Sequence, residues 1–428
     1  PQFDFAAEAA SVEAAAPLAA WPEMVFVDGV ELRQVGKRSN VVPGTFMVDR
    51  GTDRIYLGTD PTGREVRVSW LQEALFVNNG DGSIVRGIGI RRYATSVMQQ
   101  GALKVYADDA LVEDVHVVDN ATTGLSITGH DDEVRNVTAR GNGMIGISAN
   151  RPTNLVVRGS LLQGNNDEHF ADIPKAGGFK TSGANGLLLE NNTAIGNHAN
   201  GLWTDLASND VTVVRNIASF NERNAIEIEL TGDAIVAGNV VAGNQGTGVY
   251  INETNRAKVW NNTMVDNKWA WQVVDGPRTL SDPRATGVTE NIVLQNNLGA
   301  GARGESQSIT QANDYTRERT GVGMGAYASN NAYYPPATGQ GPAWFAIWGN
   351  YPSNPLIPKT LADLQQATGS ESGSFSTPGE NPFRNWNAQD FRLAAGSEAI
   401  GSGVPIPADV AAALGVGDGS IDRGALLG

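Results

Sequence analysis

Short runs of alternating apolar and polar residues recur along the middle of the chain. Four of them are GGFKTS (177–182), NGLWTD (200–205), NAIEIE (224–229) and TGVYIN (247–252). The small residues that open eight such runs, from Ala102 to Ala270, are separated by steps of 22, 22, 32, 23, 24, 23 and 22 residues. Alternation of this kind predicts strands, and near-equal steps predict a repeat in which every unit supplies the same strand.

Asparagines follow the same period. Asn192, Asn216, Asn239 and Asn262 form one series, and Asn197, Asn221, Asn244 and Asn267 form a second. The segments lack the 3.6-residue periodicity of helical repeats, so the pattern predicts an all-β parallel β-helix, a solenoid in which equivalent side chains stack about 4.8 Å apart. We expect aliphatic ladders inside and asparagine ladders at the turns, where amides satisfy buried backbone groups.

The residue pattern along the chain changes three times, which predicts four parts. Residues 1–21 are Ala-rich and predict a short helix or a loose terminus. Paired β runs with turn residues between them predict a small N-terminal β module over 22–75. The coils follow over 76–345. The last part, 346–428, is expected to form a C-terminal cap, because a solenoid exposes apolar edges at its ends.

Alternation places every second side chain of these strands on the outer face. There the repeat gathers a lysine, three carboxylates, two aromatic rings and an amide: Lys180, Trp203, Asp205, Glu227, Glu229, Tyr250 and Asn252. Stacked like charges are unfavourable, which favours a functional reason for this patch. We expect the insertion at 165–176 to form a wall beside the patch. If the loop at 276–290 closes the other end, exo action is favoured.

Paired carboxyl groups are the equipment of a glycoside hydrolase. Two of Asp205, Glu227 and Glu229 would then serve as the acid and as its base or nucleophile. Neighbouring positions of one column lie about 5 Å apart and diagonal positions about 8 Å apart, so both retention and inversion stay open. We expect Trp203, Tyr250, Asn252, His198 and His169 to bind substrate, and this chemistry requires no metal or other cofactor.

Two other functions fit the same patch. In a polysaccharide lyase acting on a uronate-containing glycan, Lys180 would be the base and the three carboxylates would bind calcium. A non-catalytic glycan-binding β-helix would keep the aromatic rings without needing crowded acids.

The composition limits the classes of ligand and partner that the protein is expected to bind. The 428 residues carry a net charge of −15, which disfavours nucleic acid and anionic membranes as ligands. There is no cysteine, hence no disulfide, and no apolar run reaches the roughly 20 residues of a membrane span. The sequence does not indicate an oligomeric state.

The coils, with GGFKTSGANGLLLENNTAIGNHANGLWTD as their clearest stretch, resemble the right-handed parallel β-helix superfamily of pectate-lyase-like carbohydrate-active enzymes. The segments WPEMVFVDGVELRQV and DFRLAAGSEAIGSG are similar to those that accompany such helices in secreted bacterial glycan-degrading proteins. The resemblance implies a right-handed coil, a poly- or oligosaccharide substrate and an extracellular location. It leaves the reaction open, because the superfamily includes hydrolases, lyases and epimerases. The DPHD-like motif of alginate-type epimerases does not occur in this sequence.

Overall fold

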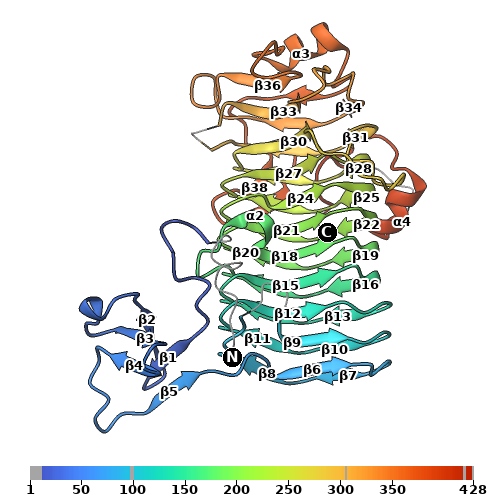
Figure 1. Ribbon diagram of the computed structural model, residues 1–428. Helices are drawn as coiled ribbons and strands as arrows, with labels where there is room; N and C mark the ends of the chain where they lie inside the picture. The colour runs from blue at the N-terminus through green and yellow to red at the C-terminus, as the bar shows by residue number, and fades with distance from the viewer. Residues whose placement is uncertain (1–11, 97–100, 304–305, 418–420, 427–428) are drawn as a thin grey trace.

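The chain winds into a tall solenoid of three long parallel sheets (Figure 1). The computed structural model describes residues 12–96, 101–303, 306–417 and 421–426. Each coil supplies one strand to each sheet, and each strand pairs in parallel with its equivalent in the next coil, as β18 does with β21. The predicted all-β parallel β-helix is confirmed.

The three sheets contain the following strands, in chain order. Sheet 1 comprises β6 (Leu75–Asn78), β9 (Gly101–Tyr106), β12 (Thr123–Ile127), β15 (Ile145–Asn150), β18 (Gly177–Ser182), β21 (Asn200–Asp205), β24 (Ile226–Glu229), β27 (Thr247–Asn252), β30 (Trp269–Asp275), β33 (Ser308–Asp314) and β36 (Trp344–Trp348). Sheet 2 comprises β7 (Ile84–Arg86), β10 (Leu111–Glu113), β13 (Glu133–Arg135), β16 (Thr153–Arg158), β19 (Asn185–Glu190), β22 (Ser208–Val214), β25 (Thr231–Ala237), β28 (Asn255–Trp260), β31 (Ile292–Gln295) and β34 (Ala326–Ser329). Sheet 3 comprises β8 (Gly89–Arg91), β11 (His116–Val118), β14 (Thr138–Arg140), β17 (Leu161–Gln163), β20 (Thr193–Ile195), β23 (Ile217–Ser219), β26 (Val240–Ala242), β29 (Thr263–Val265), β32 (Leu298–Ala300), β35 (Ala332–Tyr334) and β37 (Phe375–Ser376).

The core is the lumen of the solenoid. Inward positions of sheet 1 stack coil on coil, and the members of one such column are at most 1% exposed: Leu125, Ile147, Phe179, Leu202 and Ile226. Because side chains alternate along a strand, the residues between them point outward. The inward and outward sets predicted from the sequence are therefore those of the structure.

Two asparagine ladders connect the turns. In the one between sheets 2 and 3, the backbone N–H and the Nδ2 of Asn216 donate to Asn239 Oδ1 at 2.9 and 3.0 Å. Asn239 in turn donates through Nδ2 to Val213 O at 2.9 Å and to the next rung, Asn262, at 2.9 Å. Each asparagine side chain thus hydrogen-bonds to backbone groups of the coil before it, and its Nδ2 donates to the asparagine of the coil after it.

This ladder ends on a different residue type. Asn331 Nδ2 donates to Glu371 Oε2 at 3.0 Å, and its backbone N–H donates to Ser374 Oγ at 2.8 Å. Glu371 is fully buried, and burial raises the pKa of its carboxyl group. A carboxyl group and a hydroxyl therefore close the last rung, where no further coil supplies an amide.

The N-terminal module is a five-stranded sheet in the order β4–β3–β2–β1–β5. Its strands are β1 (Met24–Val27), β2 (Val30–Gln34), β3 (Thr45–Asp49), β4 (Arg54–Leu57) and β5 (Val66–Ser69), with the short 3-10 helix η1 (Arg38–Asn40) after β2. Met24 and Phe26 pack on Ala121 of the solenoid. Of the Ala-rich segment predicted over 1–21, residues 1–11 lie outside the described residues. The part from 12 to 20 forms a β-bridge and turns rather than a helix.

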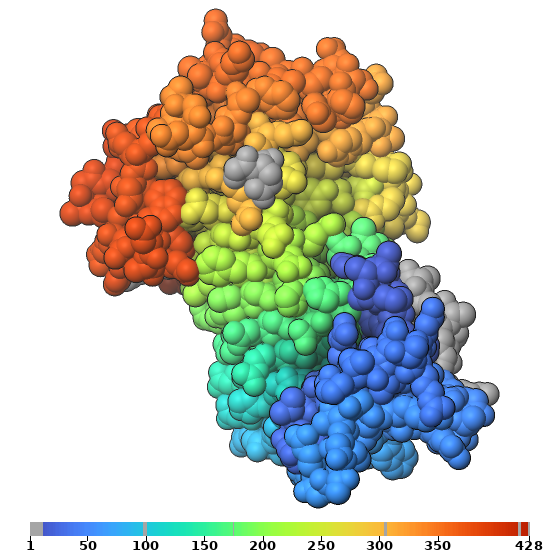
Figure 2. All heavy atoms as spheres, turned by 90° about the vertical axis from the view of Figure 1, so that its left-hand side faces the viewer, coloured from blue at the N-terminus to red at the C-terminus, as the bar shows by residue number. Residues whose placement is uncertain are grey.

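The C-terminal part takes a different position from the end cap expected for 346–428. At the end of the solenoid lie α3 (Leu361–Thr368), next to β36, and β37, the last strand of sheet 3. The following segment, with β38 (Phe383–Asn385), β39 (Asp390–Leu393) and α4 (Ala408–Leu414), runs back along the outside (Figure 2). Its apolar residues cover the outer faces of sheets 3 and 2, where Phe383 meets Val265 and Leu414 meets Trp260. Those outer faces are apolar, so they need this cover as much as the open end does.

In the part of the chain that the structure describes, no helix has the length and apolar character needed to cross a membrane.

Replacing Asn239 by Ala tests the ladder. The change removes the acceptor of the Asn216 backbone N–H and a donor to the Val213 carbonyl, whereas Asn216 Nδ2 keeps its hydrogen bonds to Leu189 O and Val214 O. We expect the free energy of unfolding to fall by about 1–3 kcal/mol, the penalty for a buried group left unsatisfied. Urea denaturation measures it, with the exposed Asn78→Ala as the control. A loss for Asn239→Ala no larger than that of the control would contradict a structural role for the ladder.

Candidate functional site

The outward face of sheet 1 is covered on two sides over β18, β21 and β24. The insertion between β17 and β18 carries the short helix α2 (Asp172–Lys175), and the loop after β30 brings Arg278 in from the other side. Between them lies a pocket of about 340 Å³. Its floor consists of Lys180, Trp203, Asp205, Glu227 and Glu229, and its walls include Asp172, Lys175, Arg223 and Arg278. The insertion thus lies where the sequence predicted a wall.

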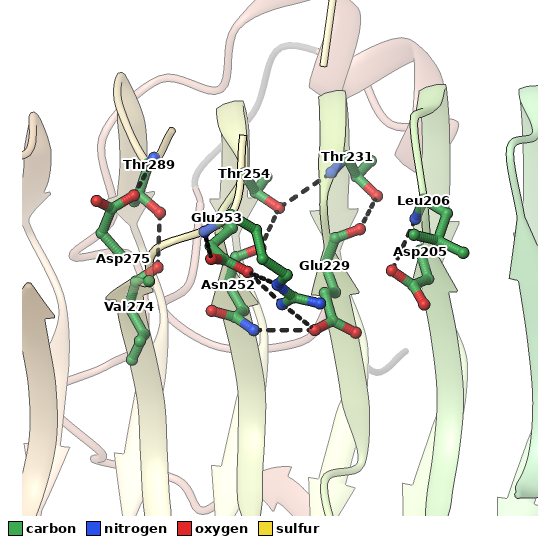
Figure 3. A network of polar contacts seen from close by, with 12 residues as sticks. Asp205, Leu206, Glu229, Thr231, Asn252, Glu253, Thr254, Val274, Asp275 and Thr289 are labelled. Carbon is green, nitrogen blue, oxygen red and sulfur yellow. Dashed lines mark hydrogen bonds and ion pairs between the residues drawn. The ribbon is translucent and has the colours of Figure 1, made fainter. Parts of the chain in front are cut away.

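The register of sheet 1 brings the floor residues together. Lys180, Trp203, Glu227 and Tyr250 are successive members of one outward column. In the neighbouring column Ser182 precedes Asp205, and Glu229 precedes Asn252 (Figure 3). All five floor residues are no more than 7% exposed, because the walls exclude solvent.

Lys180 is held between an acid and an aromatic ring. Its Nζ lies 2.7 Å from Asp205 Oδ2 and 3.3 Å from the centroid of the Trp203 ring. Asp205 also accepts a hydrogen bond from the backbone N–H of Leu206 at 2.7 Å. The ring of Trp203 therefore carries an ammonium group on one face and is not the open sugar platform that the sequence predicted.

Glu229 is surrounded by donors. Asn252 Nδ2 donates to its Oε1 at 3.1 Å (Figure 3). Trp203 Nε1 donates to its Oε2 at 2.9 Å, and Arg278 forms an ion pair with it. Burial and the neighbouring Asp205 carboxylate raise the pKa of Glu229, and Arg278 opposes the rise. Three donors around one carboxyl group favour its ionised form.

Glu227 is the most perturbed acid of the pocket. Its Oε2 accepts one hydrogen bond, from Asn224 Nδ2 at 2.8 Å. Burial and the nearby Glu229 carboxylate raise the pKa of Glu227 to about 8. The two glutamates of β24 therefore have different environments. Glu227 keeps a proton at neutral pH, whereas Glu229 faces cationic and neutral donors.

The walls are tied to the coils by their own ion pairs. Arg223, in the turn before β24, lies 2.5 Å from Asp172 of α2. Arg278 pairs with Glu253 as well as with Glu229, and its backbone N–H donates to Glu253 Oε1 at 2.8 Å. Glu253 is 1% exposed, so the loop is attached at a buried point. Burial and the Lys180 ammonium lower the pKa of Lys175 to about 7.

Four of the residues predicted to bind substrate lie outside this lining. Asn252 reaches the site only through Glu229, and Tyr250 lies next to Glu227 with a phenol pKa that burial raises. His198 and His169 stack on each other with ring centroids 5.1 Å apart, and His198 Nδ1 lies 2.9 Å from Glu222. His169 belongs to the insertion and His198 to the turn before β21, and neither lines the pocket.

The wall residues were not predicted as site residues. Arg278 follows Glu229 by 49 positions and Asp172 precedes Asp205 by 33, and neither belongs to the repeat. The one available signal was the position of the insertion and the loop relative to the acidic strands, which located the walls but not their side chains.

Comparisons with known proteins agree on the fold. Residues 101–268 match the family model described as a right handed beta helix region. No curated protein matches the chain. The structure of XylC in complex with xylose is similar, with a TM-score of 0.51 and 14% identity over 73% of this chain. The match covers 65% of the XylC chain, just under two thirds of it.

A second similar structure is the A-module of the mannuronan C-5 epimerase AlgE6 from Azotobacter vinelandii, with a TM-score of 0.47, 16% identity, and coverage of 70% of this chain and 80% of that one. At these identities the similarity concerns the fold alone. The family model and the XylC structure confirm that the coils form a right-handed parallel β-helix, as the resemblance predicted.

The Glu227→Gln variant tests the electrostatics of the pocket without reference to any reaction. Between the ordinary value of 4.5 and about 8, the folded protein holds a proton that the unfolded chain has released. Stability is therefore fully retained below pH 4.5 and is lost as the pH rises toward 8. We expect Glu227→Gln to stabilise the protein more at pH 8 than at pH 5, by a difference on the order of 2–4 kcal/mol.

Thermal unfolding at the two pH values measures this difference, with Glu380→Gln, at an exposed position, as the matched control. The same change in midpoint at both pH values would mean that Glu227 titrates normally.

Proposed function

We propose that this right-handed parallel β-helix is an enzyme that hydrolyses glycosidic bonds in the pocket between α2 and the loop of Arg278. The observation that carries the proposal is the juxtaposition of three largely buried carboxyl groups in one pocket, of which Glu227 has a pKa raised to about 8. Glycoside hydrolysis needs one protonated and one ionised carboxyl group on either side of the scissile bond.

Glu227 is the proposed general acid. A carboxyl group with a pKa of about 8 is mostly protonated at neutral pH, and it can donate its proton to the leaving oxygen of the glycosidic bond. The cleavage leaves Glu227 as a carboxylate next to Glu229, which favours recovery of the proton for the next cycle.

Asp205 is the proposed partner. It forms an ion pair with Lys180 at 2.7 Å. Asp205 lies on β21 and Glu227 on the next strand of the sheet, β24, in neighbouring outward columns. As a carboxylate it either activates water or attacks the anomeric carbon directly. Glu229, fixed by Trp203, Asn252 and Arg278, would supply negative charge opposite the oxocarbenium-like transition state.

The contacts of Lys180 favour hydrolysis over elimination. A lyase would use its neutral amine as the base, whereas Nζ here makes the contacts of an ammonium group with Asp205 and Trp203. Calcium-dependent elimination would also need a cluster of oxygen ligands. Among the described residues, no three histidine, aspartate or glutamate side chains are grouped as a metal site would require.

The shape of the pocket favours action at a chain end. Its walls rise at both edges of sheet 1, and Lys104, Ser126 and Ser148, which continue the floor toward the first coil, are no more than 7% exposed. A terminal sugar unit of a poly- or oligosaccharide is therefore the proposed ligand. The xylose in the XylC structure agrees with a sugar ligand on this fold. Secretion is part of the proposal, because polymeric glycans are degraded outside cells.

A panel digestion of neutral and uronate-containing glycans, with and without a calcium chelator, tests the reaction type. We expect products heavier by one water molecule, in equal amounts with the chelator. Unsaturated uronates, detected by their ultraviolet absorbance and lost on chelation, would replace this proposal with a lyase in which Lys180 is central.

Aryl glycosides with different leaving groups test the two roles. We expect Glu227→Gln to lose about 10²–10⁴-fold in kcat/KM on a poor leaving group but little on dinitrophenolate, which departs without a proton. Asp205→Asn should lose activity on both substrates. If Glu229→Gln rather than Glu227→Gln shows the leaving-group dependence, the acid is Glu229.

A further inference from the structure

A second concave surface lies at the junction of the N-terminal module and the first coil of the solenoid. It is a cleft of about 310 Å³ whose lining includes Arg67, Trp70, Arg91, Arg92 and Tyr93. Three arginines face this cleft, and no carboxylate is among the described residues that line it. Arg67 is bound by Glu65 through two hydrogen bonds of 2.8 and 2.7 Å, which leaves Arg91 and Arg92 as the cationic groups that face a ligand.

Trp70 and Ile173 are the most exposed large apolar residues of the described chain, each at 67%. Trp70 belongs to the link between β5 and β6, and its neighbour Leu71 is 50% exposed. An exposed indole next to cationic groups adds nothing to the packing of either the module or the coil. Exposed apolar surface of this kind marks a site of contact with a ligand.

The arginines are held in place by the fold. The guanidinium of Arg92 lies 3.9 Å from the centroid of the Phe26 ring, and its Nη2 donates to Gly29 O at 3.0 Å. Arg92 Nε is buried and has no hydrogen-bond partner among the described residues. Among the described residues Arg91 has one ion pair, a long one of 3.7 Å with Asp119, and its side chain is 59% exposed. Arg91 therefore keeps donors that an anion in the cleft can reach.

We propose that this cleft binds an anionic sugar unit, carboxylated or sulfated, of an acidic glycan. Indole rings stack on sugar rings through their apolar faces, and guanidinium groups bind carboxylates and related oxyanions through paired hydrogen bonds. Arg91 belongs to the first coil and Lys180 to the fifth, so the two sites are about 19 Å apart along the solenoid axis.

Binding is measured with the Asp205→Asn protein, which turns over no substrate, against polygalacturonate, dextran sulfate and neutral dextran at low salt. We expect binding to one or both anionic polymers and none to dextran. Which of them binds distinguishes carboxylate from sulfate recognition. We expect Trp70→Ala to weaken binding about tenfold and Arg91→Gln several-fold. The matched controls are Tyr327→Ala, which removes a ring 54% exposed on β34, and the paired Arg392→Gln.

Equal binding by Trp70→Ala and Tyr327→Ala, or equal binding of dextran, would overturn the proposal. A change in the oligomeric state of Trp70→Ala in light scattering would also overturn it, because the cleft would then be an interface between copies. This site is independent of the proposed hydrolysis. Its binding survives if the protein cleaves nothing, and Trp70→Ala should cleave a small aryl glycoside at the wild-type rate.

Discussion

The parallel pairing of each strand with its equivalent one coil later is the constraint on which the rest of the structure depends. It satisfies the backbone groups of three sheets at once and fixes the register of each strand, so a residue type that recurs with the period becomes a column. The turns must then satisfy the remaining backbone groups, and the amides of Asn216 and Asn239 do so by bonding to both neighbouring coils. An insertion of ten residues is tolerated because it leaves the ladder as a loop and the next strand resumes the same register.

The same constraint gathers the chemistry of the pocket. Asp205 and Glu229 are brought to neighbouring coils of one column, where like charges repel unless other groups compensate. Compensation comes from Lys180 on one carboxylate and from Trp203 and Arg278 on the other. Glu227 forms no ion pair among the described residues, and burial together with the Glu229 carboxylate raises its pKa to about 8. The stacking therefore places like charges closer together than is favourable for the stability of the fold. Such an arrangement is typical of functional sites.

Much of the fold follows from the sequence because the repeat has a short period and each coil repeats the same arrangement of strands. The columns of Leu202 and Trp203, one inward and one outward, were predictable from alternation alone. The closure of the ladder by Glu371 was not, since it occurs once and so has no period. The position of the C-terminal segment was not predictable either. Whether Leu414 covers an end or a side depends on which outer surfaces are apolar, and that is known only when sheets 2 and 3 are placed.

The candidate site shows the same division, between repeating residues that could be predicted and non-repeating residues that could not, more sharply. Its floor belongs to the repeat and was predicted residue by residue, whereas Arg278 and the helix of Asp172 belong to loops whose path is set by tertiary contacts. These loops decide the chemistry. On an open sheet the carboxyl group of Glu227 would be solvated, and its pKa would stay near the ordinary value; it is burial beneath the walls that raises it. The solenoid therefore supplies the spacing of the acids, and the non-repeating loops supply the burial and the cations that shift the pKa values of Glu227 and Glu229.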